Sequence, residues 1–417
     1  MFTLHRANLF CYSFMYVLIC KRSARGGTAV RNVFIAGIGQ TPVSKQSTDE
    51  VRELGAIAVR AAIQNSRLEG PTALYLGNML SGILSDQQQM GALVAQSAGL
   101  QGIEAVTIEA ACGSGGAAAR VGVMAIQSGA HDVVVVAGME RMTHAPKERV
   151  TRGLATASDW QTEGSHGATF VSLNGRLMQA YMDTHKVNND VFAPFAINAH
   201  RNANRNPNAL FHKEISESVY HDSRAIEGPL KLFDISPICD GSAAVVLVSE
   251  DIAKRLASEG QPVVKIRASA VGTDTLGLDD REKLLRLAGV ERSAKRAFEQ
   301  AKLKPSDIDI FECHDAYTVM SVLSLEASGF APEGRGFTLG LEGDIRIEGR
   351  LPITTMGGLK GRGHPVGATG VYQLVETFQQ LTGTAGANQV KSPTIAMTQN
   401  IGGTGATVIS HILERVS

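Results

Sequence analysis

Residues 110–119 read Ala-Ala-Cys-Gly-Ser-Gly-Gly-Ala-Ala-Ala and place Cys112 where a predicted strand ends and a predicted helix begins. A thiol at this place lies near the positive end of the helix dipole and near free backbone N–H groups, which favour the nucleophilic thiolate. The glycines let a substrate or a second backbone approach without a collision with Cβ atoms. A small buried thiol in a tight core gives the same pattern. Cys112 is therefore either a nucleophile or a core residue of a strand-turn-helix unit.

On both sides of this turn, short β-rich runs alternate with helical stretches, which predicts an α/β protein with βαβ units and a largely parallel sheet. We expect strands over residues 33–37, 104–109, 133–137, 263–271, 308–313, 394–398 and 407–411. We expect helices over residues 49–66, 114–127, 291–301 and 368–381. The unbroken valines of residues 133–136 are typical of a strand covered on both faces, so they predict core and not an interface. The second half repeats the order of the first, which predicts an internal duplication.

The composition excludes several classes of protein. The 417 residues carry 40 Lys and Arg against 40 Asp and Glu, so no net charge attracts nucleic acid or an anionic membrane. With 44% hydrophobic and 19% charged residues, the chain is globular and not disordered. The five widely spaced cysteines predict neither a disulfide framework nor a zinc site, and the 11 histidines show no ligand-like spacing. We expect no nucleic-acid partner, no metal and a reducing compartment.

Residues 145–230 differ from both halves because they are polar, rich in asparagine and weakly periodic. They predict an inserted loop domain that covers one face. The rest of the chain then divides into an N-terminal half, residues 28–144 with 231–260, and a C-terminal half, residues 261–417.

Residues 1–27 have the features of a targeting leader. They contain no acidic residue and carry four basic residues around an apolar run from Leu9 to Cys20. This run is shorter than the about 20 residues that span a bilayer, so no transmembrane segment is predicted. We expect a mitochondrial presequence, with a secretory signal and a mis-assigned start codon as the alternatives for the segment. Peroxisomal and cytoplasmic locations are the alternatives for the protein.

Three further turns carry residue types that suit a catalytic site. The stretch FECHDAY (residues 311–317) closes a predicted strand, where open α/β sheets place their ligands. The stretch GGLKGRGHP (residues 357–365) places a second histidine just before a helix. The stretch QNIGGTG (residues 399–405) can offer backbone N–H donors to an oxyanion. A lone histidine is usually structural, but two at element ends together with a helix-cap cysteine favour a catalytic site.

The four turns together resemble those of the thiolases, a family within the larger group of condensing enzymes that includes the ketoacyl synthases. The stretches VVAGMERM (residues 135–142) and CDGSAA (residues 239–244) are thiolase-like too, and the resemblance extends from about Val33 to Leu413. It implies duplicated βαβαβαββ halves in a layered α-β-α-β-α core. It also implies CoA thioesters as substrates, no permanently bound cofactor, and a homodimer or homotetramer formed through the sheet edge of the first half.

The resemblance implies a role for each site residue. Cys112 would take the acyl group as a thioester, and His364 would accept the thiol proton and return it to the leaving CoA thiolate. His314 would hold the thioester oxygen of the substrate, directly or through a water. The N–H groups of Cys112 and Gly402 would form the hole for the acyl-enzyme oxyanion, in a substrate-facing turn that also contains Asn400 and Gly403. These roles describe a two-step, ping-pong acyl transfer.

The chain departs from the family at the second cysteine, which in related thiolases moves the proton on the α-carbon of the substrate. The two positions where relatives carry it are Asn400 and Ala316 in this chain. Cys313 is near in sequence, but neighbouring side chains of an extended chain face opposite ways, so we expect Cys313 to face away from the pocket. Cys313, Tyr317 and His314 are the groups left to move that proton.

We expect an acyl-CoA C-acyltransferase that acts by thiolysis of a 3-ketoacyl-CoA or by the reverse condensation, with acetoacetyl-CoA as the simplest substrate. The first alternative is a ketoacyl-synthase-like enzyme that condenses after decarboxylation, because such an enzyme needs a Cys-His-His set and no second cysteine. The second alternative is an acyl-CoA-binding or lipid-binding protein of the same fold without activity. All three use CoA-type thioesters, which is the reason for preferring a mitochondrial leader over a secretory one.

Overall fold

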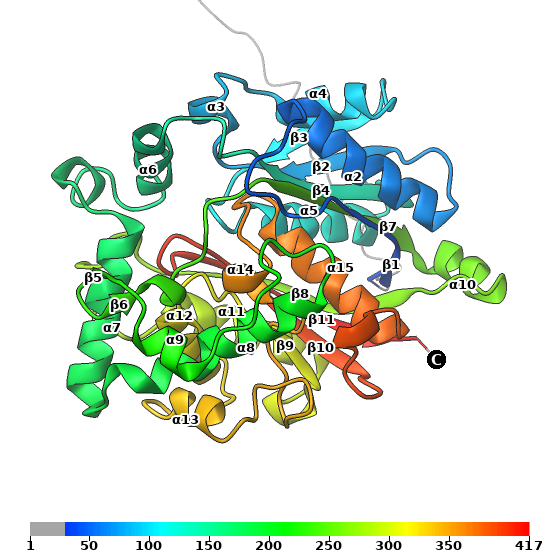
Figure 1. Cartoon of the computed structure of the whole chain (residues 1–417). Helices are drawn as coiled ribbons and strands as arrows, with labels where there is room; N and C mark the ends of the chain where they lie inside the picture. Colours follow the sequence, from blue (N-terminus) through cyan, green and yellow to red (C-terminus); the bar gives the residue numbers. More distant parts are fainter. Residues whose placement is uncertain (1–29, 417) are drawn as a thin grey trace, which may run out of the picture. The chain divides into compact units, whose positions relative to one another are not determined.

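The computed structural model describes residues 30–416, of which residues 32–416 belong to one folded unit (Figure 1). The predicted leader, residues 1–27, lies outside the described residues. Within the described part of the chain, no helix combines the length and the hydropathy needed to cross a membrane.

One nine-stranded sheet runs through this unit. In spatial order its strands are β3 (Glu104–Ile108), β2 (Ala73–Gly77), β4 (Val133–Glu140), β7 (Gly241–Ser249), β1 (Val33–Gln40), β8 (Val264–Thr273), β11 (Thr407–Arg415), β10 (Ile395–Gly402) and β9 (Ile310–Glu312). The strands of the first half occupy one side of β1 and those of the second half the other side, and β1 joins them by pairing with β8. A separate two-stranded sheet contains β5 (Ala225–Glu227) and β6 (Leu230–Lys231).

The prediction of a largely parallel sheet is wrong, because only β2–β3, β2–β4 and β9–β10 are parallel pairs. The other neighbours, among them β1–β7, β4–β7 and β8–β11, are antiparallel. β10 and β11 are joined by residues 403–406, and so short a connection permits only an antiparallel pair. β7 follows the insertion and returns between β1 and β4, antiparallel to both. Each half thus begins as βαβ units and is completed by antiparallel strands.

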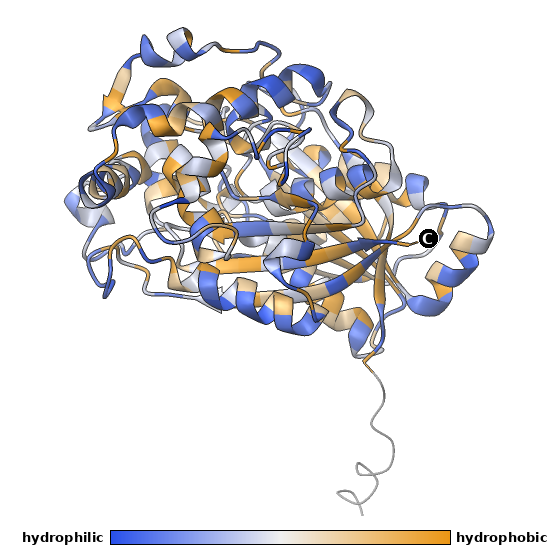
Figure 2. Cartoon of the chain, turned by 90° about the horizontal axis from the view of Figure 1, so that it is seen from below, coloured by the Kyte–Doolittle hydropathy of each residue, from blue (hydrophilic) through white to orange (hydrophobic). Residues whose placement is uncertain are grey.

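Helices form layers on both sides of the sheet, as the family resemblance implies. α5 (Ser114–Gln127) and α15 (Thr369–Thr382) pack on each other and contact strands of both halves. α2 (Val51–Ser66) covers β1, β4 and β7, and α11 (Ala288–Ala301) covers β8 and β11. α5 and α15 are therefore a central helical layer between the two parts of the sheet. α2 and α11 cover the outer faces of the sheet. Figure 2 shows that the strands are largely apolar and that the outer helices carry many polar residues.

The glycines at the start of α15 permit the close contact of the two central helices. A Cβ on Gly370 would overlap the backbone nitrogen of Gly116 in α5, so a side chain at this position would force the helices apart. The first turn of α15 follows His364, and the first turn of α5 follows Cys112. The contact therefore brings the cysteine turn and the second histidine turn together.

The remaining elements are shorter or belong to the insertion. The α-helices are α3 (Ser81–Leu84), α4 (Met90–Ser97), α6 (Lys147–Ala155), α7 (Phe170–His185), α8 (Ala193–Arg205), α9 (Glu217–His221), α10 (Glu250–Ser258), α12 (Thr318–Ala327), α13 (Gly336–Leu341) and α14 (Gly358–Gly361). The 3-10 turns are η1 (Gly164–His166), η2 (Asn189–Phe192), η3 (Leu232–Asp234), η4 (Pro305–Asp307) and η5 (Gly386–Asn388). The valine run of β4 is buried from Val134 to Val136, which confirms its prediction as core.

Residues 145–230, predicted as a loop domain, contain four α-helices, and the asparagine-rich stretch is part of one of them. Asn198, Asn202 and Asn206 are spaced four residues apart along α8 and at its end, and all three are buried. Their side-chain amides donate to main-chain carbonyls of the segment before α14: Asn198 to Ile353 at 3.2 Å, Asn202 to Thr354 at 3.0 Å and Asn206 to Met356 at 2.8 Å. The buried face of α8 also contains Phe195 and several alanines, so asparagines and apolar residues share it.

Candidate active site

The turn that carries Cys112 is strained and tightly bonded. Ala111 has a positive φ of 52°, a conformation that costs a non-glycine residue about 1–3 kcal/mol. The turn is closed by the N–H of Gly113, which donates to the Ala110 carbonyl at 2.9 Å, and by the Ser114 hydroxyl, which donates to the Ala111 carbonyl at 2.6 Å. α5 starts at Ser114, so Cys112 directly precedes the helix N-terminus. The thiol is 9% exposed and lines a cavity.

The expectation that this turn favours the thiolate is wrong for the resting protein. Burial and the nearby Glu140 carboxylate raise the pKa of Cys112 to about 12, which outweighs the opposing backbone hydrogen bond at the turn. The side chain of Cys112 is therefore a neutral thiol, and a base would have to remove its proton before the sulfur could act as a nucleophile.

His314 follows β9, and its hydrogen bonds define its tautomer. Nδ1 receives the main-chain N–H of Ile401 at 3.3 Å and the side-chain amide of Asn400 at 3.2 Å. A main-chain N–H can only donate, so Nδ1 carries no proton and a neutral ring carries its proton on Nε2. Burial lowers the pKa of His314 to about 3, so the ring is neutral at pH 7. His314 lines the cavity and has an N–H donor left to offer.

His364 lies in the second histidine turn. Its Nδ1 donates a hydrogen bond, whereas the Nδ1 of His314 accepts one. The side chains of Thr369 and His364 contact each other at 2.6 Å between Oγ1 and Nδ1, and the Thr369 hydroxyl donates to the Pro365 carbonyl at 3.1 Å. A hydroxyl has one proton, so Oγ1 accepts from Nδ1–H and leaves a lone pair on Nε2. Burial, followed by the neighbouring His314, lowers the pKa of His364 well below its usual value. His364 is thus a neutral base in the same cavity.

Buried polar contacts hold the two histidine turns in register. Asp315 accepts the N–H of Leu359 at 2.6 Å and the Lys360 ammonium at 2.7 Å, and both charged side chains are buried. The N–H of His364 donates to Sγ of Cys239 at 3.1 Å. Gly363, with a φ of 115°, allows this approach, because a Cβ there would lie 2.6 Å from a methyl group of Val43.

The third turn, residues 399–405, packs against the cysteine turn and bonds to His314. Asn400 does not reach the cavity as a free donor: its amide donates to the Cys112 carbonyl at 3.0 Å and to His314, and its carbonyl accepts the N–H of Gly116 at 3.0 Å. Gly402 lies directly against the Cys112 turn, where a Cβ would overlap the Ala110 carbonyl. Gly403 lines the cavity. Asn400 thus ties the cysteine turn to His314 and takes no direct place in a substrate pocket.

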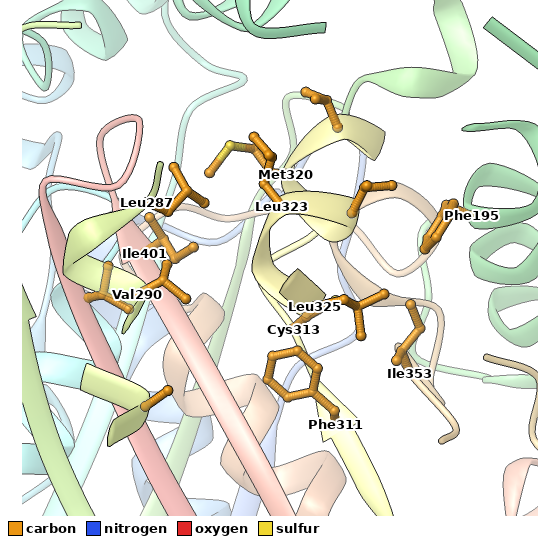
Figure 3. Packing of buried hydrophobic residues seen from close by; sticks show 14 of the residues in the cluster. Phe195, Leu287, Val290, Phe311, Cys313, Met320, Leu323, Leu325, Ile353 and Ile401 are labelled. Carbon is orange, nitrogen blue, oxygen red and sulfur yellow. The ribbon is translucent and has the colours of Figure 1, made fainter. Parts of the chain in front are cut away.

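Within the FECHDAY stretch (residues 311–317), Cys313 faces away from the cavity, whereas Ala316 and Tyr317 line it. Cys313 lies in the apolar cluster that includes Phe311 and Leu325 (Figure 3), and it does not line the cavity. This confirms that it faces away from the pocket. Ala316 and Tyr317 line the cavity together with Cys112.

The cavity has a volume of about 700 Å³ and is mostly apolar. One end of the cavity contains Cys112, His314 and His364, and the insertion supplies much of the remaining wall. Apolar wall residues of the insertion, residues 145–230, include Leu154, Phe170, Phe211 and Ile226, and Leu232 and Phe233 of the following segment extend the wall. A cavity of this size is within the range of about 300–1,000 Å³ typical of small-molecule sites.

Two residues of the site were not predicted. Thr369 orients His364, and its position five residues after the histidine at a helix start was the available signal. Glu140, at the end of β4, is buried and accepts N–H groups of Met79 at 3.0 Å and Gly367 at 3.1 Å. Glu140 belongs to the stretch VVAGMERM (residues 135–142), but the sequence does not show which loops its carboxylate joins. Among the described residues, no group of His, Cys, Asp and Glu could hold a metal ion.

The comparisons with known proteins agree with this geometry. One family model, described as "Thiolase, N-terminal domain", matches residues 33–251, and another, "Thiolase C-terminal domain-like", matches residues 270–415. An acetyl-CoA acetyltransferase from Methanothermobacter thermautotrophicus is 39% identical over 388 residues, which cover 93% of this chain and 100% of the relative. Sterol carrier protein 2 from Oryctolagus cuniculus is 29% identical over 406 residues, which cover 93% of this chain and 73% of the relative.

A solved structure, "Ltp2-ChsH2(DUF35) aldolase", has the same fold, with a TM-score of 0.80 at 24% identity over 93% of this chain and 99% of that chain. The fold and the relatives define the class of protein, an acyltransferase that uses CoA thioesters and no permanently bound cofactor. The chain belongs to the thiolase family. The predicted family, fold and enzyme class are confirmed, whereas the roles of the individual site residues stay predictions.

Proposed function

We propose that the protein transfers acyl groups through a thioester on Cys112, in the thiolysis of a 3-ketoacyl-CoA or in the reverse condensation. One observation carries the proposal: Cys112, His314 and His364 line one cavity, and their hydrogen bonds leave a donor on one imidazole and a lone pair on the other. Nucleophilic acyl transfer needs both, a base for the thiol and a donor for the developing negative charge. The name of the 39% identical relative, acetyl-CoA acetyltransferase, agrees with this reaction.

In the first half-reaction, Nε2 of His364 takes the Cys112 proton as the sulfur attacks the C3 carbonyl of the 3-ketoacyl-CoA. The C2–C3 bond then breaks, and its electron pair passes into an enolate of acetyl-CoA. Nε2–H of His314 donates to the thioester oxygen, where this negative charge collects. C2 takes up one proton, acetyl-CoA leaves, and the acyl group stays on Cys112.

In the second half-reaction, the thiol of a new CoA gives up its proton, which replaces the one that C2 took, and its sulfur attacks the thioester carbonyl on Cys112. The N–H groups of Cys112 and Gly402 hold the oxyanion that forms. The Cys112 sulfur then leaves and recovers its proton from His364, which returns the site to its neutral resting state. This scheme consumes a 3-ketoacyl-CoA and CoA and releases acetyl-CoA and a shortened acyl-CoA.

Loss of acetoacetyl-CoA in the presence of CoA tests the proposal with the full chain. Cys112→Ala and His364→Ala remove the nucleophile and the base, and each is expected to lower thiolysis by about 10²-fold or more. Cys313→Ala is the matched control, because this thiol is buried but faces away from the cavity. Release of CO₂ from malonyl-CoA without thiolysis would favour a decarboxylating condensing enzyme. Binding of acyl-CoA without an adduct on Cys112 would favour a lipid-binding protein.

The proposed homodimer uses the edge strand β3. Among the described strands β3 pairs only with β2, and Val106 at its centre is 41% exposed. An unpaired edge with an exposed apolar residue can add a strand of a second copy. Light scattering is expected to give a dimer for the natural chain and a monomer for Val106→Lys. A dimer for both proteins would show that β3 does not form the interface.

The proposed mitochondrial location depends on residues 1–27, which lie outside the described residues. The archaeal relative gives it no support. Fluorescent fusions of residues 1–417 and 28–417 in eukaryotic cells test the proposal. Only the longer fusion is expected to enter mitochondria.

A further inference from the structure

We propose that the hydroxyl of Tyr317 supplies the proton that the α-carbon of the leaving acetyl-CoA takes up, in place of the absent second cysteine. This inference rests on the proposed function, because it assigns one proton transfer within that reaction. It applies to carbon–carbon bond cleavage and not to acyl transfer between thiols.

In this scheme His314 uses its Nε2–H on the thioester oxygen and His364 keeps the Cys112 proton for its return to sulfur. The other groups near this step are engaged elsewhere or are not acidic. Cys313 faces the apolar cluster of Phe311 and Leu325. Asn400 uses its amide nitrogen and its amide oxygen in bonds to the cysteine turn, α5 and His314. The Lys360 ammonium is buried in an ion pair and a hydrogen bond with Asp315. Ala316 lines the cavity but has no acidic group.

The position of Tyr317 suits the role. Its main chain pairs with that of Ile235 as an isolated bridge, just before α12, which holds the ring at the cavity wall. The side chain is 8% exposed and lines the cavity with Cys112. Its hydroxyl makes no hydrogen bond to any residue of the described chain, although a buried phenol usually finds a partner. A substrate atom in the cavity can be that partner.

The charge state of the phenol also suits an acid. Burial, followed by the nearby Cys112, raises the pKa of Tyr317 above its ordinary value. The phenol is therefore protonated at pH 7, and it lines the same cavity as Cys112. A neutral O–H next to the nucleophile is available when the negative charge reaches C2.

The proton transfers balance over the full reaction. The Cys112 proton moves to His364 as sulfur bonds to C3, and the Tyr317 proton moves to C2 as the C2–C3 bond breaks. The resulting phenolate takes the proton of the incoming CoA thiol, whose sulfur bonds to the acyl carbonyl. Cys112 leaves and recovers its proton from His364. No oxidant or further reactant is needed.

Tyr317→Phe tests the inference because it removes only the hydroxyl. Two rates are measured: exchange of label between CoA and acetyl-CoA, and thiolysis of acetoacetyl-CoA. Exchange makes and breaks only C–S bonds, for which His364 alone moves the proton, so it is expected to stay within about threefold. Thiolysis is expected to fall by about 10²–10⁴-fold, the usual contribution of one general acid. Cys313→Ala is expected to change neither rate by more than about threefold.

Three results would overturn the inference. Equal thiolysis by Tyr317→Phe and the natural chain would mean that His364 returns its own proton to C2. An equal fall of both rates, in a variant with the circular dichroism of the natural chain, would mean that the phenol only shapes the cavity. A natural chain without label exchange would overturn the proposed function itself, and the inference with it.

Discussion

The imidazole rings of His314 and His364 meet edge to face, with ring centroids 5.1 Å apart and an interplanar angle of 86°. The two rings are alike in burial, but they are bonded differently at Nδ1. His314 accepts there from the main chain of β10, whereas His364 donates there to Thr369. One cavity therefore holds a neutral N–H donor and a neutral base side by side, which is the division of work that acyl transfer needs.

Thr369 is expected to control the tautomer of His364. Thr369→Val keeps the shape but removes the acceptor of Nδ1–H, so a part of the molecules will carry the proton on Nε2 and lack the base. We expect acylation of Cys112 to slow by about 10–100-fold. Thr369→Ser retains the hydroxyl and should acylate near the natural rate. An unchanged rate in Thr369→Val would show that Nδ1 needs no partner.

The acylation rate is expected to be nearly independent of pH between about pH 6 and pH 8. The pKa of His364 is lowered well below its usual 6.5, so the base stays deprotonated as the pH falls through this range. The pKa of Cys112 is raised to about 12, so the thiol stays protonated as the pH rises. Stopped-flow acylation measured across the range tests this. A fall of the rate toward acid with a midpoint near 6.5 would contradict the buried, neutral pair.

Asn202 is expected to stabilise the protein by joining α8 to the segment before the second histidine turn. Asn202→Ala leaves the buried Thr354 carbonyl without the donor that lies 3.0 Å away. An unsatisfied buried group costs about 1–3 kcal/mol, so the free energy of unfolding should fall by that amount. Asn204→Ala, on the exposed face of the same helix, is the matched control. Urea unfolding curves measure both variants, and equal midpoints would contradict a role for the amide.

The apolar cavity wall is expected to favour substrates longer than acetoacetyl-CoA. Each buried methylene contributes about 0.8 kcal/mol, or roughly fourfold in kcat/KM, until the chain fills the wall. Leu232→Asp places a charge on this wall and should reduce the gain for long chains without affecting acetoacetyl-CoA. Leu341→Asp, exposed on α13 and outside the cavity, is the control. A steady fall of kcat/KM with chain length would contradict the assignment of the wall to the acyl chain.

The sequence predicts local elements well where one cause decides them. The helix expected over residues 114–127 has these bounds in the structure, because its N-terminal glycines and its apolar face agree. The valine run likewise predicts β4, because consecutive β-branched residues favour a buried strand. The antiparallel order around β7 was not predictable, because strand direction depends on how the insertion returns and not on local pattern. α8 was not predicted because asparagines, which are usually exposed, lie among the apolar residues of its buried face and bond to a distant segment.

The members of the site were more predictable than their chemical state. Glycine clusters and histidines at element ends identified Cys112, His314 and His364, since such turns are recognisable from a few adjacent residues. The helix N-terminus next to Cys112 predicted a thiolate, but burial has the larger effect on the pKa. Burial arises only when segments far apart in sequence meet. The hydrogen-bond partner of each Nδ1 atom depends on the folded structure in the same way. The place of Asn400 beneath the cysteine turn has the same origin.

Mass spectrometry of the full chain after exposure to acetyl-CoA tests most directly whether Cys112 carries the acyl group. We expect a mass increase of one acetyl group on the peptide that contains Cys112, lost again when CoA is added. Cys112→Ala should show no increase, and His364→Ala should show it only slowly. No acetyl group on Cys112 in the natural chain, or one that CoA does not remove, would show that Cys112 does not carry the acyl group in the reaction.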